Sequence, residues 1–188
     1  MIPPPFVLVG GGARSGKSRF ALARGAELGT RPLFVATAEA SDEEMRLRIE
    51  RHRQERAGRY TTVEEPLALP AVIDRCVDAV AGHDVVIVDC LTLWLSNLLV
   101  HGASQETALL HVDKLCGALS HRRVPIVLVT NEVGMGLVPE TPLGRLFRDV
   151  AGLAHQRLAR DADELYFCTL GTVLRLRPAP VTAIVPAP

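Results

Sequence analysis

The chain has 188 residues, the size of a single domain, and its 48% hydrophobic and 22% charged residues are typical of a folded protein rather than a disordered one. Its 21 basic and 21 acidic residues cancel, which argues against a nucleic-acid-binding surface over the whole molecule but leaves room for a local basic patch. Four cysteines without C-x-x-C spacing predict free thiols, and no apolar stretch reaches the roughly 20 residues of a membrane-spanning helix. The first residues carry no secretion signal. We therefore expect a cytoplasmic protein with no membrane span and no nucleic-acid partner.

Strand and helix patterns alternate along the chain. Four short, continuous apolar runs predict strands buried on both faces, as in a parallel sheet, over residues 6–10, 33–37, 85–89 and 126–130. Longer segments predict helices over residues 17–28, 42–57, 69–81, 91–100, 105–121 and 143–160. Ser41 to Glu44 form a capping box, Ser-x-x-Glu, which sets the start of the second helix.

The C-terminal region departs from this alternation. Residues 164–169 and 172–177 flank Leu170-Gly171 and predict a β-hairpin at the edge of the sheet. We expect one α/β domain over residues 1–177, followed by a proline-rich tail over residues 178–188 that is extended and dispensable.

A phosphate-binding motif follows the first predicted strand. Eight residues read G-x-x-x-x-G-K-S between a strand and a helix, as a P-loop must: Gly11, Gly12, Ala13, Arg14, Ser15, Gly16, Lys17 and Ser18. Glycines let successive backbone N–H groups converge on one phosphate, and the helix N-terminus adds positive charge. Lys17 is expected to act on the β- and γ-phosphates as a catalytic group, and Ser18 to bind Mg²⁺. Only two of the 21 basic residues are lysines, and a compact ammonium fits here where a planar guanidinium would not.

We expect Asp89 to be a second anchor for the metal, because it ends an apolar strand in the manner of a Walker-B carboxylate. Alternatively, it caps the helix that begins at Leu91. Together with the P-loop, it predicts an α/β fold of the P-loop NTPase type, with a mostly parallel central sheet flanked by helices. The chain lacks Asn-Lys-x-Asp at a later strand end, which argues against a signalling GTPase and leaves small-molecule kinases and nucleotidyl transferases.

The second predicted helix has few apolar residues, so it is expected to bury little of its surface. Arg48, His52 and Arg56 follow at intervals of four and share one face. In a nucleotide site, an imidazole between two cations stays neutral and can attack a phosphorus atom. Alternatively, the helix is a solvated one with Glu–Arg pairs, in which His52 has no chemical role.

Six segments occur in a recognisable order: GGARSGKSRFA (11–21), ATAEASDEEMRLRIERHRQER (36–56), TTVEEPLAL (61–69), VDCLTLWLSNLL (88–99), TNEVGMGLVPE (130–140) and FRDVAG-x-x-x-QRLA-x-x-ADELY (147–166). Together they resemble the bifunctional adenosylcobinamide kinase/adenosylcobinamide-phosphate guanylyltransferases of cobalamin biosynthesis. The P-loop is generic, whereas RI-x-x-H-R, LTLWLSNLL and TNEVGMG-x-VPE are specific to that family. The resemblance covers residues 7–177.

This resemblance implies two reactions. The first phosphorylates the aminopropanol hydroxyl of adenosylcobinamide with ATP or GTP. The second transfers GMP from GTP, through a covalent bond to an enzyme histidine, to adenosylcobinamide phosphate, which yields adenosylcobinamide-GDP. The histidine of RI-x-x-H-R falls on His52. The resemblance also implies a homotrimer, in which a site shared between subunits would accommodate the bulky corrinoid.

The family's nucleotide contacts can be matched position by position. Beyond the P-loop they fall on Thr37, Ala38, Glu39, Arg53, Gln54, Glu55, Arg56, Glu64 and Asp89. Glu64 would accept hydrogen bonds from guanine, or it is merely a loop acid before Pro66. The chain departs from the family at Tyr60, where tryptophan is usual, and at His155, where asparagine is favoured.

Asn131 and Glu132 follow a predicted strand, where α/β sheets present ligand-contacting residues. The loop Gly134-Met135-Gly136 can flex over a corrinoid, or it is a structural turn. Two other classes of function stay open from the residues. One is a single-activity P-loop kinase for another small alcohol, which would not need His52. The other is a nucleotide-dependent regulatory protein without turnover.

Overall fold

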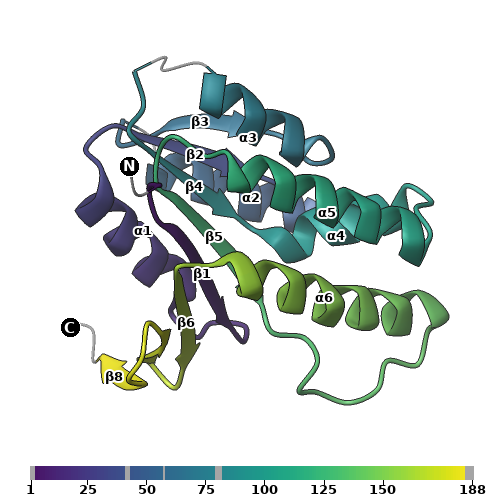
Figure 1. The fold of residues 1–188 in the computed structure, drawn as a ribbon. Helices are drawn as coiled ribbons and strands as arrows, with labels where there is room; N and C mark the ends of the chain where they lie inside the picture. Colours follow the sequence, from purple (N-terminus) through teal and green to yellow (C-terminus); the bar gives the residue numbers. More distant parts are fainter. Residues whose placement is uncertain (1–2, 41–42, 57, 79–81, 185–188) are drawn as a thin grey trace.

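The computed structural model describes residues 3–40, 43–56, 58–78 and 82–184. Within these ranges an eight-stranded sheet has the order β3-β2-β4-β5-β1-β6-β7-β8 and carries helices on both faces (Figure 1). The strands are β1 (Phe6–Gly11), β2 (Pro32–Ala36), β3 (Thr61–Glu64), β4 (Val85–Asp89), β5 (Ile126–Asn131), β6 (Glu164–Thr169), β7 (Thr172–Arg177) and β8 (Thr182–Ile184). The helices are α1 (Lys17–Leu28), α2 (Glu43–Arg56), α3 (Leu69–Asp78), α4 (Leu91–Val100), α5 (Gln105–Ser120) and α6 (Pro142–Asp161).

The first six strands in this sheet order, β3 to β6, pair in parallel with their neighbours. Strand β7 pairs antiparallel with β6, and β8 pairs antiparallel with β7 at the edge of the sheet. Most side chains of β1, β4 and β5 are buried, because helices cover both faces of these central strands. The four strands predicted from apolar runs are confirmed, each within one residue at either end. The predicted α/β fold with a mostly parallel sheet and a C-terminal hairpin is therefore confirmed.

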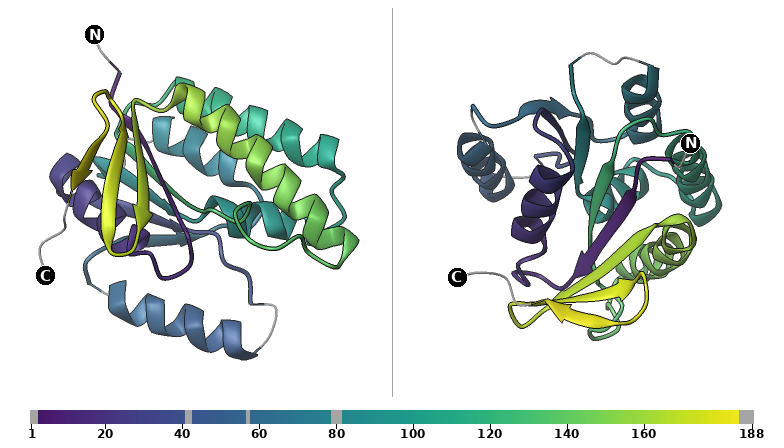
Figure 2. Two further views of the ribbon diagram at one scale, coloured as in Figure 1. Left: turned by 90° about the horizontal axis from the view of Figure 1, so that it is seen from below. Right: turned by 60° about the vertical axis from the view of Figure 1, so that its left-hand side comes forward.

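Alternating residues of each central strand face two separate cores. On β1, Phe6 and Leu8 join the core beneath α3, α4, α5 and α6. Val7 and Val9 face the other way and pack with Ala21 of α1. Figure 2 shows α1 and α2 on one side of the sheet and the larger helical layer on the other. None of the helices in the described ranges is long and apolar enough to cross a membrane.

Helix α1 lies unusually close to the sheet. A side chain at Gly25 would place its Cβ 2.5 Å from Cδ1 of Ile87 on β4, so only glycine permits this approach without a shift. The helix contacts β1, β5 and β4 in turn. It therefore ties together the strands whose carboxyl ends carry the P-loop motif, Asn131 and Asp89.

The described side chains of α2 are mostly exposed, which agrees with the polar composition of the helix. Among its described side chains Ile49 is half-buried, whereas Leu47 is 56% exposed and the charged residues face solvent. Arg46 pairs with Glu43 on the outer surface. The expected capping residue Ser41 lies outside the described residues, as does Asp42.

The structure contains two short strands that the sequence does not predict. Strand β3 pairs in parallel with β2, and its side chains are exposed or half-buried. Strand β8 lies in the proline-rich tail and pairs with β7, so the tail extends the sheet beyond the hairpin. Predicted helix ends agree within one residue, except where residues 79–81 lie outside the described ranges.

Candidate phosphate and nucleotide site

The P-loop connects β1 to α1 and is shaped by its glycines. Gly16 has a φ of 92° at the N-cap of α1, in the left-handed region that favours glycine. At Gly11 an added Cβ would lie 2.5 Å from the carbonyl oxygen of Cys168. Ser15 Oγ is buried and has no hydrogen-bond partner among the described residues. An unpaired hydroxyl inside a glycine-rich loop suits an anionic ligand.

Lys17 is the first residue of α1 and is 9% exposed. Its Nζ donates a hydrogen bond to the carbonyl oxygen of Gly12 at 3.1 Å. This contact folds the ammonium over its own loop, at the positive end of the helix. Ser18, the next residue, is half-buried in the same turn. The two residues are thus placed where phosphate oxygens and a metal ion bind in a P-loop.

Asp89 ends β4 and is separated from the P-loop strand by β5. Its register partners are Ala36 on β2 and Val129 on β5. It does not cap the following helix: the N-cap of α4 is Cys90, and no side chain caps it. Helix capping therefore does not account for a half-buried carboxylate at this position. Asp89 lies at the same edge of the sheet as the P-loop.

A polar network from α4 fixes the ends of β2 and β3. Asn97 Nδ2 donates to the carbonyl oxygens of Thr37 at 2.8 Å and of Pro66 at 3.1 Å. Trp94, fully buried, donates its indole N–H to Leu67 at 2.8 Å. The hydroxyl of Thr37 bonds both the amide and the carbonyl of Cys90. The sequence reveals LTLWLSNLL as a motif but not this role, which is to hold two loops that carry predicted nucleotide contacts.

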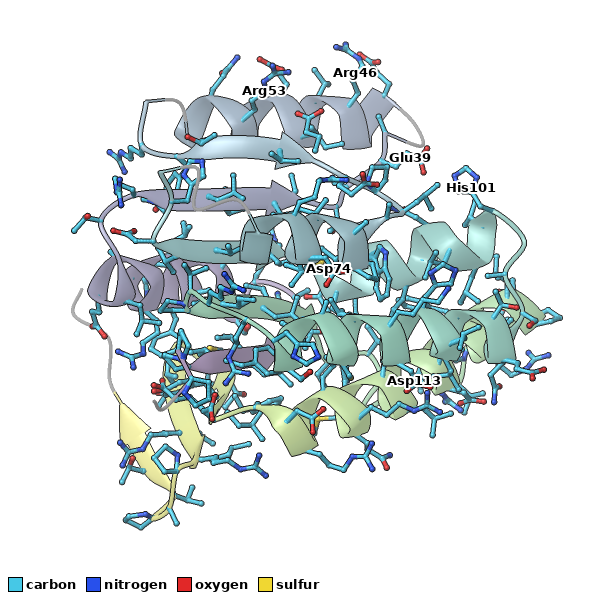
Figure 3. All side chains as sticks on the ribbon, turned by 45° about the horizontal axis from the view of Figure 1, so that its top comes forward. Glu39, Arg46, Arg53, Asp74, His101 and Asp113 are labelled. Atoms are coloured by element: carbon cyan, nitrogen blue, oxygen red, sulfur yellow. The ribbon has the colours of Figure 1, made fainter. Side chains whose placement is uncertain are left out.

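Apart from Asp89, the predicted nucleotide contacts beyond the P-loop come from three segments. Thr37 is buried after β2, whereas Ala38 is half-buried and Glu39 is exposed. The Glu39 carboxylate lies 3.0 Å from the ring of His101 at the end of α4, and Figure 3 shows the two side chains together. Arg53 on α2 lies 3.8 Å from the carboxylate of Glu64 at the end of β3.

His52 lies on α2, but its side chain is outside the described residues. The same holds for the side chains of Glu55 and Arg56. Gln54 is exposed and bonds Glu50 within the helix. The Arg53–Glu64 contact links this part of α2 to β3.

The end of β5 carries a second polar cluster. Thr130 Oγ1 lies 2.7 Å from Nε2 of His155 on α6, and Nδ1 of that ring lies 3.8 Å from Glu132 Oε2. Burial lowers the pKa of His155, although nearby Glu132 opposes the shift. The imidazole is therefore held in its neutral form. Sequence reasoning singled out Glu132 and noted His155 only as a departure from the family, because the contacts of His155 exist only in the folded chain.

The cysteines near the site are not activated as nucleophiles. Burial and the charge of Asp89 raise the pKa of Cys90 to about 11, and burial raises the pKa of Cys168. Both thiols stay protonated at neutral pH, which leaves them inert. Within the described ranges no group of three or more His, Cys, Asp or Glu residues forms a metal cluster. A metal here would be held by few protein ligands, as Mg²⁺ usually is.

The chain is similar over most of its length to proteins of adenosylcobalamin biosynthesis. A family model described as cobinamide kinase / cobinamide phosphate guanyltransferase matches residues 7–176. The bifunctional adenosylcobalamin biosynthesis protein CobP of Pseudomonas aeruginosa is 42% identical over 179 residues, which cover 93% of this chain and 98% of that protein. CobU of Escherichia coli is 37% identical over 183 residues, which cover 91% and 99%. Among solved structures, the RadB recombinase matches with a TM-score of 0.56 and 14% identity over 96% of this chain and 86% of its own, a likeness of fold alone.

Proposed function

The chain belongs to the cobinamide kinase / cobinamide phosphate guanyltransferase family and is a bifunctional enzyme of adenosylcobalamin biosynthesis, for which we propose two reactions at one nucleotide site. In the first, ATP or GTP phosphorylates the aminopropanol hydroxyl of adenosylcobinamide. In the second, GTP donates GMP to the phosphate so formed, which releases pyrophosphate and yields adenosylcobinamide-GDP.

The kinase reaction is assigned to the P-loop. The observation that carries this assignment is the buried Lys17 at the first turn of α1, folded over the loop by its bond to Gly12. From there the ammonium neutralises charge on the β- and γ-phosphates as the γ-phosphoryl group moves. The loop amides, at the N-terminus of α1, bind the remaining phosphate oxygens.

Ser18 and Asp89 fit a magnesium ion. The first offers a hydroxyl beside Lys17, and the second a half-buried carboxylate at the same sheet edge without a capping role. These oxygen ligands suit Mg²⁺, which keeps several waters and bridges substrate phosphates. When bound, Mg²⁺ would neutralise charge on the β- and γ-phosphate oxygens.

The transferase reaction is assigned to His52. Its imidazole attacks the α-phosphorus of GTP, a nitrogen–phosphorus bond forms, and pyrophosphate leaves as the α–β bridging bond breaks. An oxygen of adenosylcobinamide phosphate then attacks the same phosphorus and frees the histidine. Thr37, Ala38, Glu39, Arg53, Gln54, Glu55, Arg56 and Glu64 are proposed to bind the guanine nucleotide. The Arg53–Glu64 pair supports this grouping, because it brings the neighbourhood of His52 to the end of β3.

Incubation with α-labelled and γ-labelled GTP, without a second substrate, tests the covalent step. The enzyme should retain the α-label but not the γ-label, and the bound GMP should survive alkali and be lost in mild acid. His52→Asn should retain no label. His121→Asn, which changes an exposed histidine at the end of α5, is the matched control and should behave as the wild type.

The same experiment distinguishes the bifunctional enzyme from the second candidate function, a kinase with a single activity. A single-activity P-loop kinase would phosphorylate its acceptor while retaining no α-label, and His52→Asn would leave that activity unchanged. If His52→Asn still forms adenosylcobinamide-GDP at an appreciable rate, the covalent mechanism is wrong. The homotrimer and a domain ending near residue 177 stay predictions, which light scattering and truncation would test.

A further inference from the structure

Glu132 lies directly beside the P-loop. It follows β5, which separates the P-loop strand β1 from the strand that ends in Asp89. Its backbone N–H donates to the carbonyl oxygen of Gly11 at 3.0 Å, so its main chain is anchored to the first residue of the loop. Ligands of α/β sheets bind at this carboxyl edge of the strands.

The carboxylate of Glu132 has a fixed orientation. Its Oε1 accepts a hydrogen bond from the backbone N–H of Gly134 at 2.6 Å. A Cβ at Gly134 would lie 2.9 Å from the same oxygen, so the carboxylate packs closely against this turn. With one oxygen bound, the side chain cannot rotate freely, and Oε2 has a defined position.

Oε2 is free to accept a proton. Nδ1 of His155 lies 3.8 Å from it, beyond hydrogen-bond distance, and burial keeps that imidazole neutral by lowering its pKa. In the described part of the chain no arginine or lysine lies within ion-pair distance of Glu132. The side chain is 28% exposed. An oriented, accessible carboxylate without a cation to neutralise it has the properties of a general base.

The surface next to Glu132 suits a large acceptor. The loop that follows exposes Met135, Leu137 and Val138, which are 81%, 95% and 63% exposed. Neighbouring apolar side chains open to solvent mark a binding surface rather than a core. An acceptor that covers them would bring a hydroxyl on its flexible arm toward the end of β5.

We propose that Glu132 is the catalytic base of the kinase reaction, an inference that rests on the function proposed above. The substrate hydroxyl oxygen bonds to the γ-phosphorus as the bond from that phosphorus to the β–γ bridging oxygen breaks. The nucleoside diphosphate leaves with that electron pair. The hydroxyl proton passes to Oε2 of Glu132 and then to water when the product departs.

The second reaction provides an internal control. Its acceptor is a phosphate monoester, which is largely ionised at neutral pH and has no proton to surrender before it attacks. Formation of the His52 adduct needs no acceptor at all. A loss of the base at Glu132 should therefore impair the kinase reaction and spare both steps of GMP transfer, whereas a structural defect of the P-loop would impair all three.

The test compares Glu132→Gln with Glu140→Gln, the same substitution at a neighbouring loop residue. Glutamine keeps an oxygen that can accept from Gly134 but is not a base at neutral pH. General-base catalysis contributes ~10²–10⁴ in rate, so Glu132→Gln should lower the kinase kcat at least 100-fold. Nucleotide affinity and GMP transfer to supplied adenosylcobinamide phosphate should stay within about twofold of the wild type. Glu140→Gln should leave all three unchanged.

Two results would overturn the proposal. One is a Glu132→Gln kinase kcat within about fivefold of the wild type. The other is an equal loss of kinase and transferase activity, which would make Glu132 a structural residue. A wild-type enzyme that lacks kinase activity would instead refute the proposed function itself, and Glu132 would have no reaction to serve.

Discussion

Removing the side-chain amide of Asn97 should loosen the loops that follow β2 and β3. This one group donates to two carbonyl oxygens, those of Thr37 after β2 and Pro66 after β3. Both contacts are partly buried and join segments far apart in the sequence. Asn97→Ala deletes both donors and leaves two acceptors with reduced access to water.

The expected loss of stability in Asn97→Ala follows from the two hydrogen bonds that the substitution removes. Each lost hydrogen bond costs about 1–1.5 kcal/mol when the acceptor stays partly buried, which gives roughly 2–3 kcal/mol for the pair. Alanine regains about 0.5 kcal/mol through its higher helix propensity. The free energy of unfolding should therefore fall by about 2 kcal/mol. Asn97→Asp keeps the shape but turns oxygens toward the two carbonyls, so its loss should be at least as large.

Urea denaturation monitored by circular dichroism measures the stability change, and the KM for GTP reports on the loops. We expect KM to rise severalfold, because Asn97 fixes the segment that begins at Thr37. Gln105→Ala removes an exposed amide from the first turn of α5 and is the matched control. A loss below about 0.5 kcal/mol in Asn97→Ala would refute the reasoning, since it is smaller than one typical net hydrogen bond.

Three further outcomes are expected. Lys17→Ala should lower the kinase kcat by ~10²–10³, because the phosphates lose a preorganised charge, and near-normal turnover would rule out the P-loop assignment. Gly11→Ala should lower the free energy of unfolding by about 1–3 kcal/mol in urea titrations, because its methyl group would lie 2.5 Å from the Cys168 carbonyl oxygen; unchanged stability would mean that the strand ends yield easily. Burial lowers the pKa of His155 below its ordinary value of 6.5, so the unfolded chain binds the proton more tightly and stability should fall as pH drops below 6.5. His155→Asn should flatten that part of the stability–pH curve, and an unaltered slope would contradict the cause assigned to it.

The sequence predicts best what local patterns determine. The buried strands were readable because a run such as residues 126–130 is apolar on both faces. The P-loop could be placed because its motif requires a strand before it and a helix after it. Strand β3 escaped prediction because its four residues are only partly buried and gain their conformation from pairing with β2. Strand β8 likewise depends on pairing with β7, and the prolines around it predict a loop rather than a strand.

Contacts between distant elements could not be predicted in the same way. Nothing in the sequence near Asn97 indicates that it bridges Thr37 and Pro66, which are 60 and 31 residues away. The His155 contact with Thr130 likewise depends on how α6 lies over β5. His52 shows the opposite case, because its motif singles it out in the sequence while its side chain lies outside the described residues.

The placement of α1 across β1, β5 and β4 has a consequence for how the two activities are lost under stress. Helix α1 packs closely against β4 at Gly25 and covers the strands that lead to the P-loop, Glu132 and Asp89. Mild heating should therefore leave all three groups in place or displace all three at once. The proposed nucleophile is on α2, whose described side chains are mostly exposed, and it still needs the P-loop to hold GTP. Heating that disrupts only α2 should therefore remove the transferase activity and leave the kinase, whereas heating that disrupts the P-loop should remove both activities.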